Sequence, residues 1–217
     1  IAIATAKIRM GMADCIVAGG TESMSLVPTA GWKTVPAYSI AKEDPDYYLS
    51  MGLTAEAVAK EFNISREAQD EFSYNSHQKA IAAIQNGHFK LGILPINIEE
   101  VYVDAKGKKQ KRNYVVDTDE GPRADTSIEA LAKLKPAFAA GGVVTAGNSS
   151  QTSDGAAFVI VMGEKMMNEL GLKPIGRLVN CAVAGVHPRI MGIGPVAAIP
   201  KVLKQAGMNL TDIDLIE

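Results

Sequence analysis

The sequence predicts an α/β protein that carries a mixed insertion. Residues 1–27 combine a helical pattern with a short apolar strand, and residues 141–162 return to apolar β-type sequence. Between them, residues 28–140 pass from proline-rich sequence through helical periodicity to alternating apolar and polar residues. We interpret that segment as an inserted domain and not a linker, and we expect residues 163–217 to open a further α/β region.

The sequence begins within a helical pattern and ends within a strand pattern. IAIATAKIRMG is typical of the later part of a buried helix that ends at Gly11. A strand is expected at Cys15–Ala18, with Gly19 and Gly20 as its exit. The last residues, DIDLIE, indicate a strand that is being entered. We therefore expect the chain to be the middle part of a longer protein.

Helical and hairpin signals fill the inserted segment. Residues 28–50 contain several prolines and predict an irregular excursion, whereas residues 53–86 predict two helices, the second capped by Ser65. Residues 93–116 alternate around AKGKKQKR and predict a β-hairpin with a basic tip. The expected core face of the second helix carries Ala68, Phe72, Ala80 and Ile84.

Two further helices have start and stop signals. Thr126 and Glu129 have the spacing of a capping box, and Pro136 would stop the helix that follows. Pro195 is expected to open a helix that Gly207 closes.

Small residues gather in the run VVTAGNSSQTSDGAA at 143–157, between two apolar β-type runs that we expect to be buried. Glycine has no Cβ, so a ligand or another backbone can approach such a run closely. Asn148, Ser149 and Ser150 would bring an amide and two hydroxyls to that approach. A tight turn of small polar residues is the alternative, since such clusters mark most loops.

Composition limits the classes of function. The chain has 217 residues, of which 47% are hydrophobic and 21% charged, as is usual for a soluble globular protein. A formal net charge of −2 gives no electrostatic basis for binding nucleic acid. No apolar run approaches the roughly 20 residues that a membrane span needs. Cys15 and Cys181 form neither a disulfide framework nor a metal motif, which fits a reducing compartment.

Four stretches, in order along the chain, resemble the degradative 3-ketoacyl-CoA thiolases. No single stretch is decisive, but their combination is specific. They are ADCIVAGGTESMS (13–25), SMGLTAEAVAKEFNISREAQDEF (50–72), DEGPRADTSIEALAKLKPAFAAGGVVTAGNSSQTSDGAA (119–157) and VAGVHPRIMGIGPVAAIPKVLKQAG (183–207).

This resemblance implies a fold of two similar, layered five-stranded βαβ halves with an inserted loop domain that holds coenzyme A (CoA). Residues 1–27 would end the N-terminal core half, residues 28–140 would form the loop domain, residues 141–162 would return to the core, and residues 163–217 would start the C-terminal half. Such proteins are expected to be homodimers or homotetramers, with no membrane span and no nucleic-acid partner.

The implied reaction is cleavage of a 3-ketoacyl-CoA by CoA, which gives acetyl-CoA and a shortened acyl-CoA in fatty acid β-oxidation. A cysteine thiolate attacks the keto carbon, and CoA then resolves the acyl-enzyme. CoA is a substrate, and no metal or other cofactor is expected. The family's nucleophile should lie just before Ile1 and its other catalytic motifs beyond Glu217. We therefore assign no catalytic residue to this chain and expect it to be inactive alone.

Eight positions match residues that contact CoA or line the acyl pocket in this family. Arg123 matches an arginine that packs against the adenine, and a solvated arginine is the alternative. Leu134 and Phe138 would press on the pantetheine and acyl chain, although such a pair is also usual in a plain core. The full set is Met51, Arg123, Leu134, Phe138, Ala146, Ser149, Ser150 and Met191.

The cysteines, the histidines and the basic run of the hairpin are interpreted as structural residues. Cys15 and Cys181 match no catalytic motif, and we expect each to pack as a small apolar residue. The three histidines are expected on the surface or at caps. The basic run around the hairpin could face the 3′-phosphate of CoA, but a charged hairpin that blocks edge pairing is the preferred interpretation. The run comprises Lys106, Lys108, Lys109, Lys111 and Arg112.

The expected subclass rests on small sequence differences. Biosynthetic acetoacetyl-CoA thiolases typically have His-Met-Gly at 50–52 and Asn-Ala-Ser-Gly at 148–151, and this chain has Ser-Met-Gly and Asn-Ser-Ser-Gln. Both differences resemble the degradative type. The alternatives are a biosynthetic thiolase, a thiolase-like acyl-CoA or lipid-binding protein without catalysis, and a condensing enzyme of the same fold. We expect a bacterial cytoplasmic location, with the peroxisome as the alternative.

Overall fold

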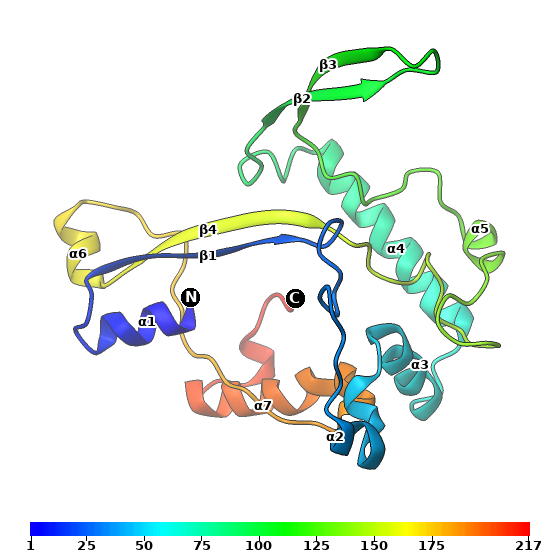
Figure 1. Cartoon of the computed structure of the whole chain (residues 1–217). Coiled ribbons are helices and arrows are strands. Elements are labelled where there is room, and N and C mark those ends of the chain that lie inside the picture. The colour runs from blue at the N-terminus through cyan, green and yellow to red at the C-terminus, as the bar shows by residue number, and fades with distance from the viewer. The chain divides into compact units, whose positions relative to one another are not determined.

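The computed structural model describes all 217 residues, which form two compact units (Figure 1). The first unit joins residues 1–62 with residues 152–217, and the second comprises residues 63–151. Both contain helices and strands, in agreement with the predicted α/β class. The limits expected from the sequence at 28, 141 and 163 stay a prediction. None of the helices combines the length and the apolar character that crossing a membrane requires.

The first unit contains most of the helices. Its first part holds α1 (Ala2–Arg9), β1 (Cys15–Ser23), α2 (Tyr38–Glu43), the 3₁₀ turn η1 (Pro45–Tyr48) and α3 (Met51–Glu61). Its second part holds β4 (Asp154–Met162), α6 (Glu164–Glu169), η2 (Pro188–Ile193), α7 (Gly194–Ala206) and η3 (Leu210–Asp212).

An antiparallel two-stranded ribbon joins β1 to β4, with Cys15 opposite Met162 and Ser23 opposite Asp154. Figure 1 shows these strands side by side, although they are far apart in the chain. The prediction that Gly19 and Gly20 end the strand is wrong, because β1 continues through them. A Cβ at Gly19 would lie 2.5 Å from Cδ1 of Phe158, so glycine lets β4 approach closely.

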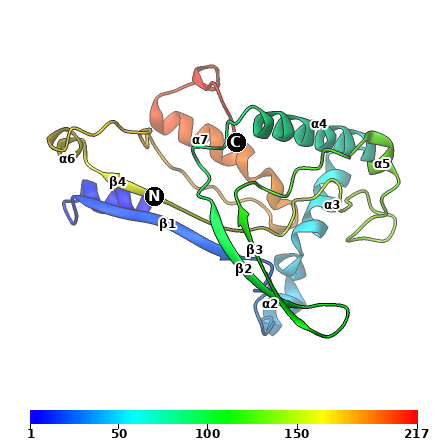
Figure 2. The same cartoon turned by 90° about the horizontal axis from the view of Figure 1, so that it is seen from above.

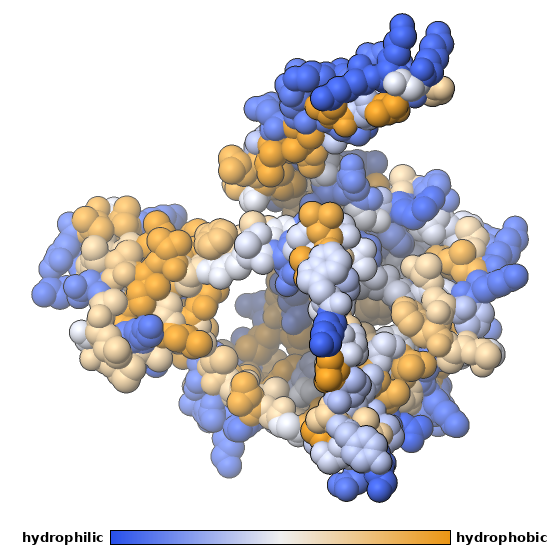
Figure 3. All heavy atoms as spheres, viewed as in Figure 1, coloured by the Kyte–Doolittle hydropathy of each residue, from blue (hydrophilic) through white to orange (hydrophobic).

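Strand β4 is exposed over most of its length, contrary to the prediction of a buried strand, and one face of the ribbon is open while the other is half-buried at Ile16, Ala18 and Val161. Phe158 is 61% exposed, and Val17 and Ile160 are exposed as well. Helix α1 packs against both strands, and within α1 only Ala4 is buried. Figure 3 shows hydrophobic side chains on the surface of this part of the molecule. The apolar pattern indicates which side chains favour burial, but the face that carries Val17, Phe158 and Ile160 stays exposed in this unit.

Local signals set the helices of this unit. The hydroxyl of Ser50 caps α3 by accepting a hydrogen bond from the backbone N–H of Leu53 at 3.4 Å. Gly207, at φ 66° and ψ 31°, closes α7, as predicted. The excursion at 28–50 is not wholly irregular, because it contains α2 and η1. Helix α3 packs against η2, which brings residues 51–61 and 188–193 together.

The second unit consists of α4 (Arg66–Gln85), the hairpin β2–β3 and the short helix α5 (Ile128–Ala132). Ser65 caps α4 as predicted, because its hydroxyl accepts from the N–H of Ala68 at 3.2 Å. The predicted core face of α4 is wrong at Ala68 and Phe72, which are both exposed, Phe72 to 78%. The buried residue of α4 is Asp70.

The predicted hairpin is confirmed. Strand β2 (Ile96–Val103) pairs with β3 (Lys109–Val116), and Figure 2 shows the two strands side by side. Its connection turns at Gly107, whose φ of 74° favours glycine.

The cap of α5 lies one residue later than predicted. Ser127, and not Thr126, accepts from the backbone N–H of Ala130 at 3.1 Å. Adjacent hydroxyls can compete for one helix start, and the sequence pattern does not separate them.

Candidate functional site

A tight turn at 145–150 of the second unit is organised around Thr145, which is 0% exposed. The backbone N–H of Thr145 donates to Oδ1 of Asn148 at 2.7 Å. Its hydroxyl accepts from the N–H of Gly147, and its carbonyl accepts from the hydroxyl of Ser149 at 2.7 Å. Ala146 and Ser150 are left exposed at the rim. The turn thus presents small side chains and backbone outward, while its own polar groups are satisfied inward.

Helix α5 and the chain that follows it pack against this turn. A Cβ at Gly147 would lie 2.5 Å from Cδ2 of Leu131 and 2.6 Å from Cδ1 of Leu134. The missing Cβ therefore makes room for both leucine side chains. Leu131 is 3% exposed and anchors the contact, whereas Leu134 lies closer to the surface.

The segment around Phe138 runs beside the same turn. Pro136 forms an isolated antiparallel bridge with Thr145, and the N–H of Ala137 donates to the carbonyl of Val144 at 2.9 Å. Phe138 follows directly and is partly exposed. Five of the positions expected to hold CoA thus lie in two neighbouring segments of one unit, residues 134–138 and 143–150. They are Leu134, Phe138, Ala146, Ser149 and Ser150.

Arg123 lies in the same unit and is oriented by two partners. Its Nε and Nη2 donate to the two carboxylate oxygens of Asp125, at 3.1 and 2.9 Å. Its backbone N–H donates to Nδ1 of His77 at 3.1 Å. The hydrogen bonds from Arg123, followed by its positive charge, lower the pKa of Asp125 below the ordinary value. The bidentate pair fixes the plane of an exposed guanidinium, whose faces stay open for stacking.

The two methionines lie in the first unit. Met51 is the first residue of α3, and Met191 lies in η2. Both are exposed, and the two elements pack against each other. The structure therefore places these two positions on neighbouring elements, where unbranched thioethers could adapt to an apolar ligand.

Two side chains of the basic run have partners within the hairpin itself. Lys111 pairs with Glu99 at 2.8 Å and Arg112 with Glu100 at 2.6 Å, across β2 and β3. The guanidinium carbon of Arg112 also lies 5.8 Å from the ring centre of Tyr102 and 5.2 Å from that of Tyr114. These contacts favour a role in the hairpin over phosphate binding for Lys111 and Arg112.

The prediction that the cysteines pack as small apolar residues is wrong, because Cys15 and Cys181 are both exposed. The capping expectation holds for His187, whose Nδ1 accepts from the N–H of Arg189 at the start of η2. No group of three His, Cys, Asp or Glu residues is arranged to hold a metal ion.

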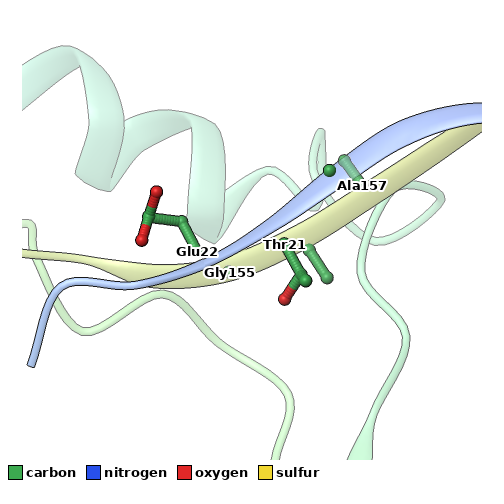
Figure 4. Close-up of a pocket in the computed structure, with 6 residues that line it drawn as sticks. Thr21, Glu22, Gly155 and Ala157 are labelled. Atoms are coloured by element: carbon green, nitrogen blue, oxygen red, sulfur yellow. The ribbon is translucent and has the colours of Figure 1, made fainter. Parts of the chain in front are cut away.

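A shallow hollow lies on the β1–β4 ribbon (Figure 4). Glycines and alanines form most of its lining, with Thr21 and Glu22 from β1. Figure 4 shows Thr21 and Glu22 pointing to opposite sides of the ribbon, as adjacent strand residues do. None of the eight expected positions lines this hollow.

Sequence reasoning missed the charged residues beneath the turn. Asp70 is 2% exposed and forms an ion pair with Arg66 at 2.7 Å, and Asn148 donates to the same carboxylate at 3.1 Å. The only local signal was the spacing of Arg66 and Asp70, four residues apart on one helix.

Two family models match the chain. The model described as "Thiolase, N-terminal domain" matches residues 1–165, and that described as "Thiolase, C-terminal domain" matches residues 172–217.

Individual relatives carry two different names. The 3-ketoacyl-CoA thiolase of Bacillus subtilis is 48% identical over 217 residues, which are 100% of this chain and 56% of that protein. The acetyl-CoA acetyltransferase of Escherichia coli is 41% identical over 230 residues, which cover 100% of this chain and 56% of that protein. The dimeric peroxisomal thiolase of Saccharomyces cerevisiae has a similar solved structure, with a TM-score of 0.84 and 39% identity over 97% of this chain and 52% of that chain. The chain thus spans about half the length of the relatives that it matches.

Proposed function

The chain belongs to the thiolase family and has its fold, and on that basis we propose that the protein cleaves 3-ketoacyl-CoA thioesters with CoA. The products are acetyl-CoA and an acyl-CoA shortened by two carbons. CoA is a substrate, and no metal or other cofactor takes part. The observation that carries the proposal is the adjacency of residues 134–138 and 143–150, which brings five expected CoA positions together.

The geometry of the second unit suits a pantetheine arm. Exposed Ala146 and Ser150 leave the backbone of the turn open to close approach, and Leu134 and Phe138 offer apolar surface beside it. The guanidinium of Arg123, oriented by its two hydrogen bonds to Asp125, would stack on the adenine and still keep N–H donors for phosphate oxygens. The thiolate that forms the acyl-enzyme is expected outside this sequence. The chain alone would hold CoA weakly and would not turn over.

The degradative reaction is the preferred subclass. Relatives named 3-ketoacyl-CoA thiolase and acetyl-CoA acetyltransferase both match, so the preference rests on Ser50 and on residues 148–151. In this structure Ser50 caps α3, next to Met51. A degradative enzyme should cleave long 3-ketoacyl-CoA at least as fast as acetoacetyl-CoA. A strict preference for acetoacetyl-CoA would favour the biosynthetic alternative.

Assembly and location follow the same reasoning. We propose a homodimer or homotetramer, supported by the dimeric yeast thiolase among the similar structures. The bacterial cytoplasm is the proposed location. Relatives from Bacillus subtilis and from human peroxisomes are both similar, so the peroxisome stays the alternative.

Arg123→Ala tests the assignment of the CoA site in the protein expressed from its complete gene. The KM for CoA should rise about three- to tenfold, equivalent to about 0.7–1.4 kcal/mol, with kcat little changed. Arg177→Ala is a matched control, because it removes an exposed arginine that has no proposed role. An unchanged KM would remove Arg123 from the site. Absence of thiolysis in the wild-type protein, with CoA still bound, would favour the non-catalytic binding protein.

A further inference from the structure

Asp70 accepts hydrogen bonds from two directions inside the second unit. Its Oδ2 accepts from Nε of Arg66 at 2.7 Å, and its Oδ1 accepts from Nδ2 of Asn148 at 3.1 Å. The residue is 2% exposed, so it interacts with these donors instead of bulk water. A buried carboxylate is tolerated only when it is paired in this way.

The Asn148 side chain transmits this contact to the turn. Besides Asp70, its Nδ2 donates to the carbonyl of Val143 at 3.0 Å. Its Oδ1 accepts from the N–H of Thr145 at 2.7 Å. The carboxylate of Asp70 and the carbonyl of Val143 can only accept, so together they determine that the Nδ2 end of the amide faces them. That orientation in turn places the amide oxygen against Thr145 and closes the turn.

The Arg66 side chain transmits the same contact to the end of α5. Its Nη2 donates to the carbonyl of Leu131 and, at 3.2 Å, to that of Leu134. The Leu131 carbonyl also accepts from the backbone N–H of Leu134 at 3.0 Å, so Arg66 reinforces the turn that ends α5. Asp70 holds the guanidinium through Nε, and this orientation lets Nη2 reach both carbonyls.

We infer that Asp70 is a positioning residue for CoA binding. Through Asn148 it fixes the turn that presents Ala146 and Ser150, and through Arg66 it fixes the backbone at Leu134. The inference rests on the proposed function, because Ala146, Ser150 and Leu134 are CoA contacts only under that proposal. A buried ion pair often adds little net stability compared with apolar packing, whereas its directional hydrogen bonds can specify one conformation. Removing Asp70 alone leaves Arg66 without its anion, so stability should fall as well; a change in the CoA affinity of the folded protein is the effect that a purely structural residue would not produce.

Asp70→Asn in the protein from the complete gene tests this role. Asparagine keeps the shape but offers one acceptor for two donors, so either Arg66 or Asn148 loses its partner. The KM for CoA should rise about tenfold, while kcat changes less than about twofold. Glu71→Gln makes the same chemical change at the next, exposed position and should leave both constants unchanged. CoA affinity is also measured directly by calorimetry, and the melting temperature of every variant is recorded.

A double variant tests whether the effect passes through Asn148. If it does, Asp70→Asn combined with Asn148→Ala should raise KM no further than the worse single variant. Additive effects would overturn that route. A lower melting temperature with an unchanged KM would make Asp70 a purely structural residue.

Two further outcomes keep the test decisive. If Asp70→Asn does not fold, Asn148→Ala alone leaves the Asp70–Arg66 pair intact, and an unchanged KM in that variant overturns the inference. Failure of the proposed function would be seen earlier, in the wild-type protein. A wild type that neither cleaves 3-ketoacyl-CoA nor binds CoA overturns the proposed function and this role together. An active wild type with an unaffected Asp70→Asn overturns only this role.

Discussion

Gly147→Ala is the substitution whose effect the structure defines most directly. The added methyl group would lie 2.5 Å from Cδ2 of Leu131 and 2.6 Å from Cδ1 of Leu134. Ordinary carbon contacts are about 3.5–4.0 Å, so each leucine methyl must retreat by about 1 Å. Leu131 is buried and cannot turn toward solvent, whereas Leu134 is partly exposed and can. We therefore expect the free energy of unfolding to fall by about 1–2 kcal/mol, within the usual range for overpacking.

Equilibrium unfolding in urea, followed by circular dichroism, measures this change. Gly92→Ala is the matched control in the same unit, because a Cβ there meets only the carbonyl of Phe89, at 3.7 Å. The control should stay within about 0.5 kcal/mol of the wild type. Displacement of Leu134 should also raise the KM for CoA in Gly147→Ala. A Gly147→Ala protein as stable as the control would refute the packing of α5 on the turn.

The remaining predictions concern the first unit. The N–H and hydroxyl of Ser25 donate to the carboxylate of Asp154, and the hydroxyl contact is the main cause that lowers the pKa of Asp154 below 3.8. A lowered pKa contributes stability above the ordinary value, which is lost as pH falls through the folded-state value. The stability difference between wild type and Asp154→Asn should therefore be constant near neutral pH and shrink in acid. A difference that persists in strong acid contradicts this. Separately, Cys15→Ala and Cys181→Ala should each keep the acyl-enzyme burst, and loss of the burst in a folded variant would place the nucleophile within this chain.

Local signals predicted α3, α4, α7 and the hairpin well, but they predicted neither α2 nor α6. Ser65 and Gly207 act at short range, so their effects are visible in a few neighbouring residues. The cap of α5 was misplaced because Thr126 and Ser127 offer the same hydroxyl chemistry. Arg66 also donates to the carbonyl of Leu131 in α5, 65 residues away. A contact over that distance in the sequence does not appear in local patterns.

Burial and the site were less predictable from the sequence. The apolar pattern of β4 indicates a preference for burial but not which element covers the strand, and here most of the strand stays exposed. Asp70 resembles a solvated helix charge until Asn148, 78 residues away, is placed beside it. The CoA positions came from resemblance to a family. What the structure added is that residues 134–138 and 143–150 lie together.

The β1–β4 ribbon has a consequence for hydrogen exchange. The sheet has two strands, so neither strand has a ladder partner on its outer side. In an antiparallel pair, successive residues point their backbone groups alternately toward the partner and away from it. Amides of Cys15–Ser23 should therefore exchange with deuterium in an alternating slow and fast pattern. Any strand that adds to the outer edge of β1 would slow the fast set alone, so residue-resolved exchange identifies which edge is occupied.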